Sequence, residues 1–221
     1  VFLGEGLGAE GEALGEVCFN TSMTGYQEIL TDPSYAAQIV AFTFPHIGNV
    51  GTNQQDLETS SPAAAAAARG AVFRAKPTPP SNWRADDDLS SWLKKRNVVG
   101  LAGLDTRALT KRIREHGMPN AVIAHAPNGK FDLDALRAKA KAWSGLDGLD
   151  LAKDVTTAQS YVVNEGLWHW PMGVAPVAKP RFTVVVMDYG VKRNILRALG
   201  EIGAKTIVLP ATATFEEAMA H

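Results

Sequence analysis

Ser34 lies in residues 21–51, TSMTGYQEILTDPSYAAQIVAFTFPHIGNVG, a segment rich in glycine, proline, asparagine, serine and aromatic residues. Asp32 before Pro33 favours a turn, and the proline ring fixes the backbone. A hydroxyl held there both donates and accepts hydrogen bonds, which suits an amide or amino-acid ligand. From residue type alone, a serine that caps the next helix is the more ordinary interpretation.

Cys18 is the only cysteine and therefore the only possible thiol nucleophile. It stands between Val17 and Phe19 in an expected strand, with no helix N-terminus and no adjacent basic residue to lower its pKa. We expect a structural, partly buried cysteine. One cysteine also excludes an internal disulfide framework and any multi-cysteine zinc site.

The histidines give no metal signature. None of them shows ligand spacing such as HxxxH, so we expect no metal site. His46 follows Pro45 in a glycine-rich loop at a strand end, where functional groups often lie. A lone histidine there is more often a hydrogen-bonding part of the loop. The histidines are His46, His116, His125, His169 and His221.

The residues DYG at 188–190 end an expected buried strand, RFTVVVMD at 181–188. In parallel sheets, ligands bind beyond the carboxyl ends of strands, so KRN at 192–194 could face a ligand or a partner. A solvated first helical turn is the more ordinary interpretation. The turn has too few glycines for a phosphate-binding loop.

The first ~170 residues mix strands and helices without a regular βαβ rhythm. Short apolar runs separated by GAEGEA predict a hairpin in residues 1–20. Asp105 is a good N-cap and Gly117 a good stop for a helix between them. Further strands are expected at 38–44, 71–74, 98–101 and 121–125, and further helices at 89–96 and 133–143.

The pattern changes near Pro180. A strand at 181–188, a helix ended by Gly203, a strand at 205–210 and a capping box in TFEE at 214–217 predict the first βαβ unit of a doubly wound parallel sheet. The predicted fold class is α/β, with a mixed α+β N-terminal domain at 1–173, a linker at 174–180 and this incomplete second domain at 181–221. Both ends fall inside expected elements, so we expect a fragment of a longer protein.

Composition narrows the function classes. The net charge is −1, with 46% hydrophobic and 20% charged residues. This balance gives no electrostatic reason to expect a nucleic acid or an anionic membrane as partner. No run approaches the ~18 apolar residues of a membrane span, and no secretory signal opens the chain. We expect a cytoplasmic protein.

Several long motifs then carry a resemblance. They are FNTSMTGYQEILTDPSY at 19–35, FPHIGNVGTN at 44–53, SNWR at 81–84, GLDTRALT at 103–110, LAKDVTT at 151–157 and MDYGVKRNILRAL at 187–199. In this order they resemble the small subunit of carbamoyl-phosphate synthase through almost the whole chain. The last motif resembles the start of that subunit's class I glutamine amidotransferase domain. The alanine run at 63–68 departs from the mixed segment that we would expect there.

The resemblance implies a glutamine-hydrolysing ligase subunit. The small subunit releases ammonia and delivers it to a large subunit, which makes carbamoyl phosphate for arginine and pyrimidine synthesis. The resemblance places the catalytic cysteine, histidine and glutamate beyond His221, so this chain alone should be inactive. It gives Ser34 the role of contacting the substrate glutamine. No cofactor is expected in this chain, whereas ATP and Mg²⁺ are expected in the large subunit.

Two other functions stay open from the sequence. The chain could be a non-catalytic docking or scaffold module for a large synthetase subunit, because a relative that had lost the cysteine would look the same over these residues. A flavodoxin-like ligand-binding protein is a weaker alternative, since no glycine-rich phosphate loop is present.

Overall fold

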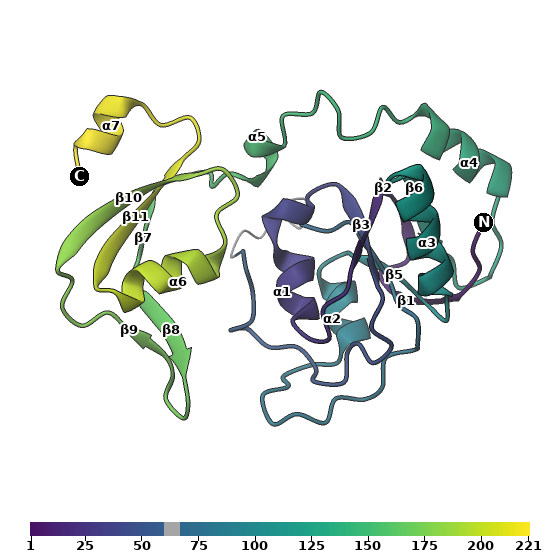
Figure 1. The fold of residues 1–221 in the computed structure, drawn as a ribbon, viewed down its shortest axis with the longest axis horizontal. Helices are drawn as coiled ribbons and strands as arrows, with labels where there is room; N and C mark the ends of the chain where they lie inside the picture. The colour runs from purple at the N-terminus through teal and green to yellow at the C-terminus, as the bar shows by residue number, and fades with distance from the viewer. Residues whose placement is uncertain (60–66) are drawn as a thin grey trace. The chain divides into compact units, whose positions relative to one another are not determined.

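The structure, a computed structural model, describes residues 1–59 and 67–221 (Figure 1). Contacts divide the chain into two compact units. The first comprises the described residues of Val1–Leu57 and Ala63–Leu149, and the second those of Glu58–Pro62 and Asp150–His221. Most of the alanine run at 63–68 lies outside the described residues.

The first unit is built on a six-stranded sheet of order β1-β5-β4-β3-β2-β6. The four inner strands run parallel, and each edge strand pairs antiparallel with its neighbour. The mixed α/β class predicted from the sequence is therefore confirmed. The strands are β1 Glu5–Gly8, β2 Gly11–Asn20, β3 Gln38–Phe42, β4 Gly70–Val72, β5 Val99–Ala102 and β6 Asn120–His125.

The predicted hairpin in residues 1–20 is wrong. β1 pairs with β5, whereas β2 pairs with β3 and β6. Gly8 and Gly11 both have positive φ, which lets the chain bend from one edge of the sheet toward the other. The ring of His125 lies against Gly6 of β1, leaving no room for a side chain there. The two edge strands therefore approach each other and the sheet nearly closes.

Successive side chains of β3 point to opposite faces of the sheet, and both faces are buried. Val40 and Phe42 pack in a core with helices α1 and α2, whereas Ile39 and Ala41 pack in a second core with α3. The helices of the unit are α1 Tyr26–Thr31, α2 Leu89–Lys95, α3 Thr106–His116 and α4 Leu133–Ala142.

The predicted ends of α3 are confirmed. The Asp105 carboxylate accepts a hydrogen bond from the Ala108 backbone N–H at the start of the helix. Gly117 ends the helix with a φ of 84°, a backbone conformation that a residue with a Cβ rarely adopts. The apolar face between these ends buries Leu109 and Ile113 against the sheet.

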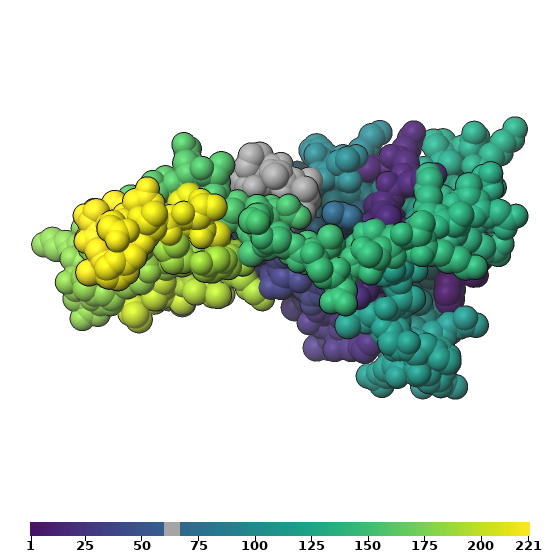
Figure 2. All heavy atoms as spheres, turned by 90° about the horizontal axis from the view of Figure 1, so that it is seen from above, coloured from purple at the N-terminus to yellow at the C-terminus, as the bar shows by residue number. Residues whose placement is uncertain are grey.

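The second unit contains the predicted βαβ motif. β10 and β11 pair in parallel, with α6 as the crossover helix, and β7 pairs antiparallel with β11. The capping box of Thr214 and Glu217 is present, and α7 buries none of its residues. The C-terminal residues, yellow in Figure 2, lie at the surface. The elements are α5 Leu151–Val155, β7 Tyr161–Val163, β8 Glu165–His169, β9 Gly173–Pro176, β10 Phe182–Asp188, α6 Arg193–Glu201, β11 Ala204–Pro210 and α7 Phe215–Met219.

The compact units have different limits from the predicted domains. Residues 150–173 group with the second unit, because β7 extends its sheet and β8 packs against α6. The expected linker at 174–180 begins inside β9. β10 was expected to be a buried strand but is only half-buried, since it is an edge strand in the described part of the chain.

Among the residues that the structure describes, no helix has both the length and the apolar character needed to cross a membrane.

Candidate functional site

Ser34 occupies the middle of a short 3₁₀ helix, Pro33–Tyr35, between α1 and β3. The Asp32 carboxylate accepts a hydrogen bond of 2.9 Å from the Ser34 backbone N–H, so Asp32 is the residue that caps the turn. The Ser34 side chain is exposed, and its hydroxyl makes no hydrogen bond to any residue in the described ranges. The ordinary interpretation of Ser34 as a helix cap is therefore wrong.

The turn is anchored to the sheet on both sides of Ser34. Tyr35 accepts a hydrogen bond of 3.0 Å at its hydroxyl from the side-chain amide of Asn20, at the end of β2. Ala37 is buried and has a φ of 60°, an uncommon conformation for a residue with a Cβ. Its carbonyl accepts a hydrogen bond from the Glu16 N–H. The hydroxyl of Ser34 is thus free to bind while its backbone is fixed.

The TGYQE and PHIGNVGTN segments brace each other behind this turn. Tyr26 donates its hydroxyl hydrogen to the Gly51 carbonyl at 2.5 Å. Gln27 makes a two-way pair with Asn53, because its amide nitrogen donates to the Asn53 carbonyl and its oxygen accepts from the Asn53 N–H. Burial raises the pKa of the Tyr26 hydroxyl above its usual range.

Gly51 shows why this brace needs glycine. Its φ is 70°, and a Cβ there would lie 2.5 Å from the Ala85 Cβ and 3.0 Å from the Asp87 carbonyl. Both the backbone conformation and the space therefore exclude a side chain. The special residues of 21–51 thus bind α1 to the loop at 51–53, and α1 leads directly into the Ser34 turn.

The SNWR motif also supports this loop. Arg84 pairs with Asp56 at 2.7 Å, and Ser81 donates its backbone N–H to the Asn49 carbonyl. A cavity of about 210 Å³ lies between α1, the loop and Arg84.

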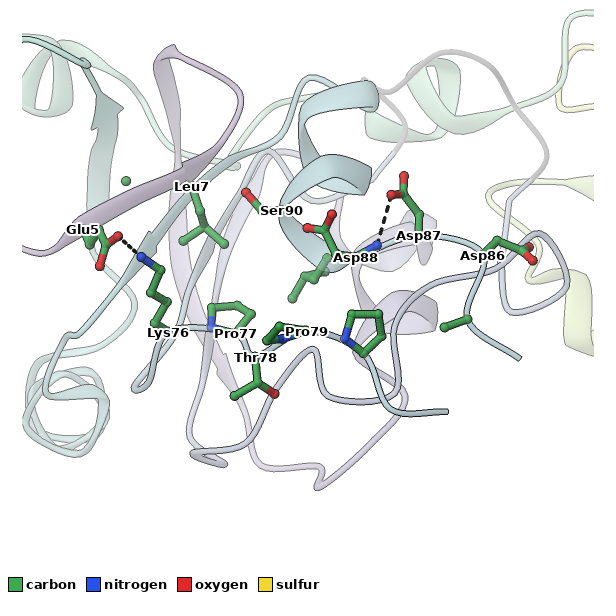
Figure 3. Close-up of a pocket in the computed structure, with 14 residues that line it drawn as sticks. Glu5, Leu7, Lys76, Pro77, Thr78, Pro79, Asp86, Asp87, Asp88 and Ser90 are labelled. Atoms are coloured by element: carbon green, nitrogen blue, oxygen red, sulfur yellow. Dashed lines mark hydrogen bonds and ion pairs between the residues drawn. The ribbon is translucent and has the colours of Figure 1, made fainter. Parts of the chain in front are cut away.

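A larger groove of about 790 Å³ lies elsewhere on the first unit, between residues 77–80 and the start of α2 (Figure 3). Lys76 pairs with Glu5 at one end of it. Asp88 accepts hydrogen bonds from the side chain and backbone of Ser91, which lower the pKa of its carboxyl group. Asp87 pairs with Lys95. Asp88 therefore caps α2 and Asp87 pairs with its last residue, whereas the Lys76–Glu5 pair ties residue 76 to β1. Ser34 does not line the groove.

Cys18 is a structural residue, as predicted. Its side chain is 8% exposed and packs in the core with α1 and α2. Burial raises the pKa of its thiol to about 11. The thiolate is the reactive form of cysteine, so Cys18 is unsuited to nucleophilic attack at neutral pH.

We expect the Cys18 thiol to resist disulfide-exchange reagents in the folded chain. A pKa raised from 9.0 to about 11 lowers the thiolate fraction at pH 8 by about 100-fold, and burial slows access further. Absorbance measured with an aromatic disulfide reagent should show slow labelling in buffer and fast labelling in urea. Labelling in buffer at the rate of a small free thiol would contradict the burial.

No group of three or more His, Cys, Asp or Glu residues that could hold a metal ion occurs in residues 1–59 and 67–221. His46 contacts Phe44 edge-on, with ring centroids 6.2 Å apart. His169 lies 3.0 Å from a carboxylate oxygen of Glu201.

Asp188 holds the loop at the carboxyl end of β10. It is 6% exposed and accepts hydrogen bonds from the backbone N–H groups of Gly190, Val191 and Thr157. The sequence left residues 192–194 either facing a ligand or partner or solvated in a first helical turn; the Asp188 carboxylate before them binds backbone N–H groups. The LAKDVTT segment that supplies Thr157 carried no predicted role beyond its resemblance.

The basic residues after Asp188 also have structural partners. Arg193 and Arg197 both pair with Glu165 of β8, at 2.8 and 3.2 Å. Burial alone would raise the pKa of Glu165, but hydrogen bonds and charge from the two arginines outweigh burial and hold that pKa below its usual value. The first turn of α6 is further fixed by Glu58, which accepts from the N–H groups of Arg193 and Asn194.

The comparisons with known proteins agree with this arrangement of motifs. Residues 1–123 match the family described as the carbamoyl-phosphate synthase small chain, CPSase domain. The chain belongs to the carbamoyl-phosphate synthase small-chain family.

Carbamoyl phosphate synthase small chains from several bacteria are similar to the whole chain. The protein from Caulobacter vibrioides is 64% identical over 221 residues, which cover all of this chain and 57% of that protein. The protein from Mesorhizobium japonicum is 63% identical over 220 residues and covered to 55%, and that from Bradyrhizobium diazoefficiens is 57% identical and covered to 56%. The chain therefore spans about half the length of the curated relatives it matches.

Membership of the carbamoyl-phosphate synthase small-chain family confirms the resemblance carried by the motifs. The role of Ser34 toward glutamine stays a prediction, as do the domain limits at 173 and 181. The sequence did not predict that Glu58 would bind the first turn of α6. It also did not predict the hydrogen bonds that Thr156 and Thr157 make in the second unit. Only the placement of LAKDVTT among the family motifs could have pointed to the threonines.

Proposed function

We propose that the chain is part of a glutamine-hydrolysing small subunit of carbamoyl-phosphate synthase. The observation that carries this proposal is the 64% identity to such a small chain across all 221 residues. In the proposed reaction, glutamine is hydrolysed to glutamate and ammonia, and the ammonia passes to a large subunit that makes carbamoyl phosphate. We place ATP and Mg²⁺ with the large subunit.

The proposed chemistry divides between this chain and the rest of the protein. We place the nucleophilic cysteine, its histidine base and the orienting glutamate beyond His221. The cysteine thiolate attacks the glutamine amide, ammonia leaves, and water releases glutamate from the thioester, with backbone N–H groups stabilising the oxyanion. Cys18, with its buried thiol, takes no part.

Ser34 is the residue of this chain that we assign to the substrate. Its hydroxyl is exposed and has no partner in the described residues, and its backbone is fixed by Asp32 and Pro33. A hydroxyl held in this way can donate to a carboxylate or carbonyl oxygen and accept from an ammonium or amide group. Glutamine carries all four of these groups.

Ser34→Ala in the full-length small subunit, assembled with the large subunit, tests this assignment. The lost hydrogen bond is worth about 0.5–1.5 kcal/mol, so kcat/KM for glutamine should fall by about 2- to 13-fold. The measurement is initial-rate kinetics of glutamate formation. Ser22→Ala is the matched control, because Ser22 is an exposed serine in the same motif that takes part only through its backbone N–H.

Synthesis of carbamoyl phosphate from added ammonia should be the same in both variants and in the unchanged protein. Unaltered glutamine kinetics in Ser34→Ala would remove Ser34 from the site. If the unchanged full-length protein bound the large subunit without hydrolysing glutamine, the alternative of a docking module would replace the proposed function.

A further inference from the structure

Two threonines cross the carboxyl ends of both parallel strands of the second unit. Thr156 directly follows α5 as its C-cap, and its hydroxyl accepts a hydrogen bond of 2.8 Å from the backbone N–H of Ala211, the residue after β11. Thr157 donates its backbone N–H to Asp188, the last residue of β10, at 2.7 Å. One dipeptide is thus bonded to the ends of two adjacent strands.

The two carboxylate oxygens of Asp188 accept hydrogen bonds from different segments. Oδ2 accepts from Thr157, whereas Oδ1 accepts from the N–H groups of Gly190 and Val191, at 3.0 and 2.9 Å. Hydrogen bonds to an ionised acceptor are stronger than those between neutral groups. The carboxylate therefore ties the loop at 189–192 to the dipeptide as well as to its own strand.

The chain after the dipeptide follows the same edge of the unit. The Thr157 hydroxyl donates to the Gln159 carbonyl at 2.8 Å, which closes a turn. β7 then pairs with β11, with Tyr161 opposite Val208. The dipeptide is therefore held from both sides, by α5 before it and by β7 after it. It provides a fixed point for the two loops.

These loops lie where a doubly wound sheet binds its ligands, beyond the carboxyl ends of the parallel strands. Tyr189 in the first loop is 62% exposed, so the loop presents a side chain outward while its backbone is held inward by Asp188. A misplacement of about 1 Å in groups that position a substrate can cost about 100-fold in rate. Such loops therefore need a rigid support.

We propose that Asp188, Thr156 and Thr157 form a clamp that positions the loops at 189–192 and 211–214 for glutamine binding. This inference rests on the proposed glutamine hydrolysis. Asp188 and Thr156 are positioning residues, because they act through the two loops and not by contact with the substrate. The clamp couples the LAKDVTT and MDYGVKRNILRAL motifs, which are 30 residues apart in the sequence.

The clamp is tested with two variants, Thr156→Val and Thr156→Ser. Both are made in the full-length small subunit and assembled with the large subunit. Valine keeps the shape of threonine but removes the acceptor for Ala211, whereas serine keeps the hydroxyl. We expect Thr156→Val to raise KM for glutamine by about 3- to 10-fold, with a smaller change in kcat. Thr156→Ser should have nearly the KM of the unchanged protein. The ammonia-dependent rate should not change in either variant.

Asp188→Asn provides the second test. If its one oxygen keeps the bonds to Gly190 and Val191, its NH₂ group faces the Thr157 N–H, and that bond is lost. Amide hydrogen exchange at Thr157 should then accelerate more than exchange at Gly190, together with a rise in KM for glutamine. If Asp188→Asn does not fold, the threonine pair carries the test alone.

The outcomes separate the two proposals. Thr156→Val that melts at a lower temperature but keeps the glutamine KM of the unchanged protein would make the clamp purely structural and overturn this inference alone. A full-length protein that does not hydrolyse glutamine at all would overturn the proposed function and the clamp's role in it. A raised KM that serine does not restore would also count against the Thr156 hydroxyl.

Discussion

Phe42→Ala is expected to lower the free energy of unfolding of the first unit by about 3–5 kcal/mol. Phe42 is fully buried at the end of β3 and stacks on the equally buried Phe73, with ring centroids 5.4 Å apart and planes 3° from parallel. Removing one ring takes away its transfer free energy and leaves a cavity beside the other ring. Because domains are stable by only about 5–15 kcal/mol, this single change approaches the limit of folding.

Urea unfolding followed through the indole N–H resonance of Trp92 would measure this loss, because Trp92 lies in the same core as Phe42. Phe131→Ala is the matched control, since Phe131 is a phenylalanine of the same unit that is 39% exposed. Its effect should be well under half as large. Phe42→Leu should cost less than Phe42→Ala, because leucine refills part of the cavity and buries more apolar surface than alanine. Equal losses for Phe42→Ala and Phe131→Ala would show that the stacked pair is not the centre of this core.

Elements with strong local signals were predictable from the sequence. Asp105 and Gly117 mark the two ends of α3, and the capping box of Thr214 and Glu217 starts α7. The apolar runs of β10 and β11 with a helix between them indicate a parallel pair, and the structure has that pair. In each case the responsible residues lie within a few positions of the feature they determine.

The elements that were missed depend on distant partners. β1 was expected to pair with β2, but Ala9 instead donates its N–H to the carbonyl of Val98, far along the chain. The apolar runs of residues 1–20 fit either arrangement, so the pattern alone does not decide between them. β7 is three residues long with an exposed centre, and it becomes a strand because β11 offers an edge.

In the candidate site, too, local features were predictable from the sequence and long-range contacts were not. The Asp-Pro sequence before Ser34 predicted a fixed turn, and the structure has the turn with an exposed hydroxyl. The pairing of Gln27 with Asn53 was not predictable, because it depends on how two loops meet after folding. Asp188 was noticed as a strand end, yet the direction of its carboxylate is fixed by Thr157, which is 31 residues earlier in the chain.

The 221-residue chain alone is expected to produce no glutamate from glutamine above the level of a protein-free blank. Its single thiol is that of Cys18, which is buried and has a pKa of about 11, and it stands in β2 with no histidine bonded to its sulfur in the described residues. Loss of a catalytic nucleophile in a comparable covalent mechanism costs on the order of 10⁶ in kcat. Glutamate formation coupled to glutamate dehydrogenase would measure the remaining rate against the full-length protein.

Cys18→Ala in the full-length protein separates a missing nucleophile from an inactive fold. Because Cys18 packs as a small apolar residue in the core, alanine should leave glutamine hydrolysis nearly unchanged and lower stability slightly. Glutamine turnover by the 221-residue chain, or loss of turnover in a folded Cys18→Ala protein, would place the nucleophile in β2 and contradict the assignment beyond His221. If the alanine variant keeps its activity while the short chain has none, both results would support the proposed place of the nucleophile beyond His221.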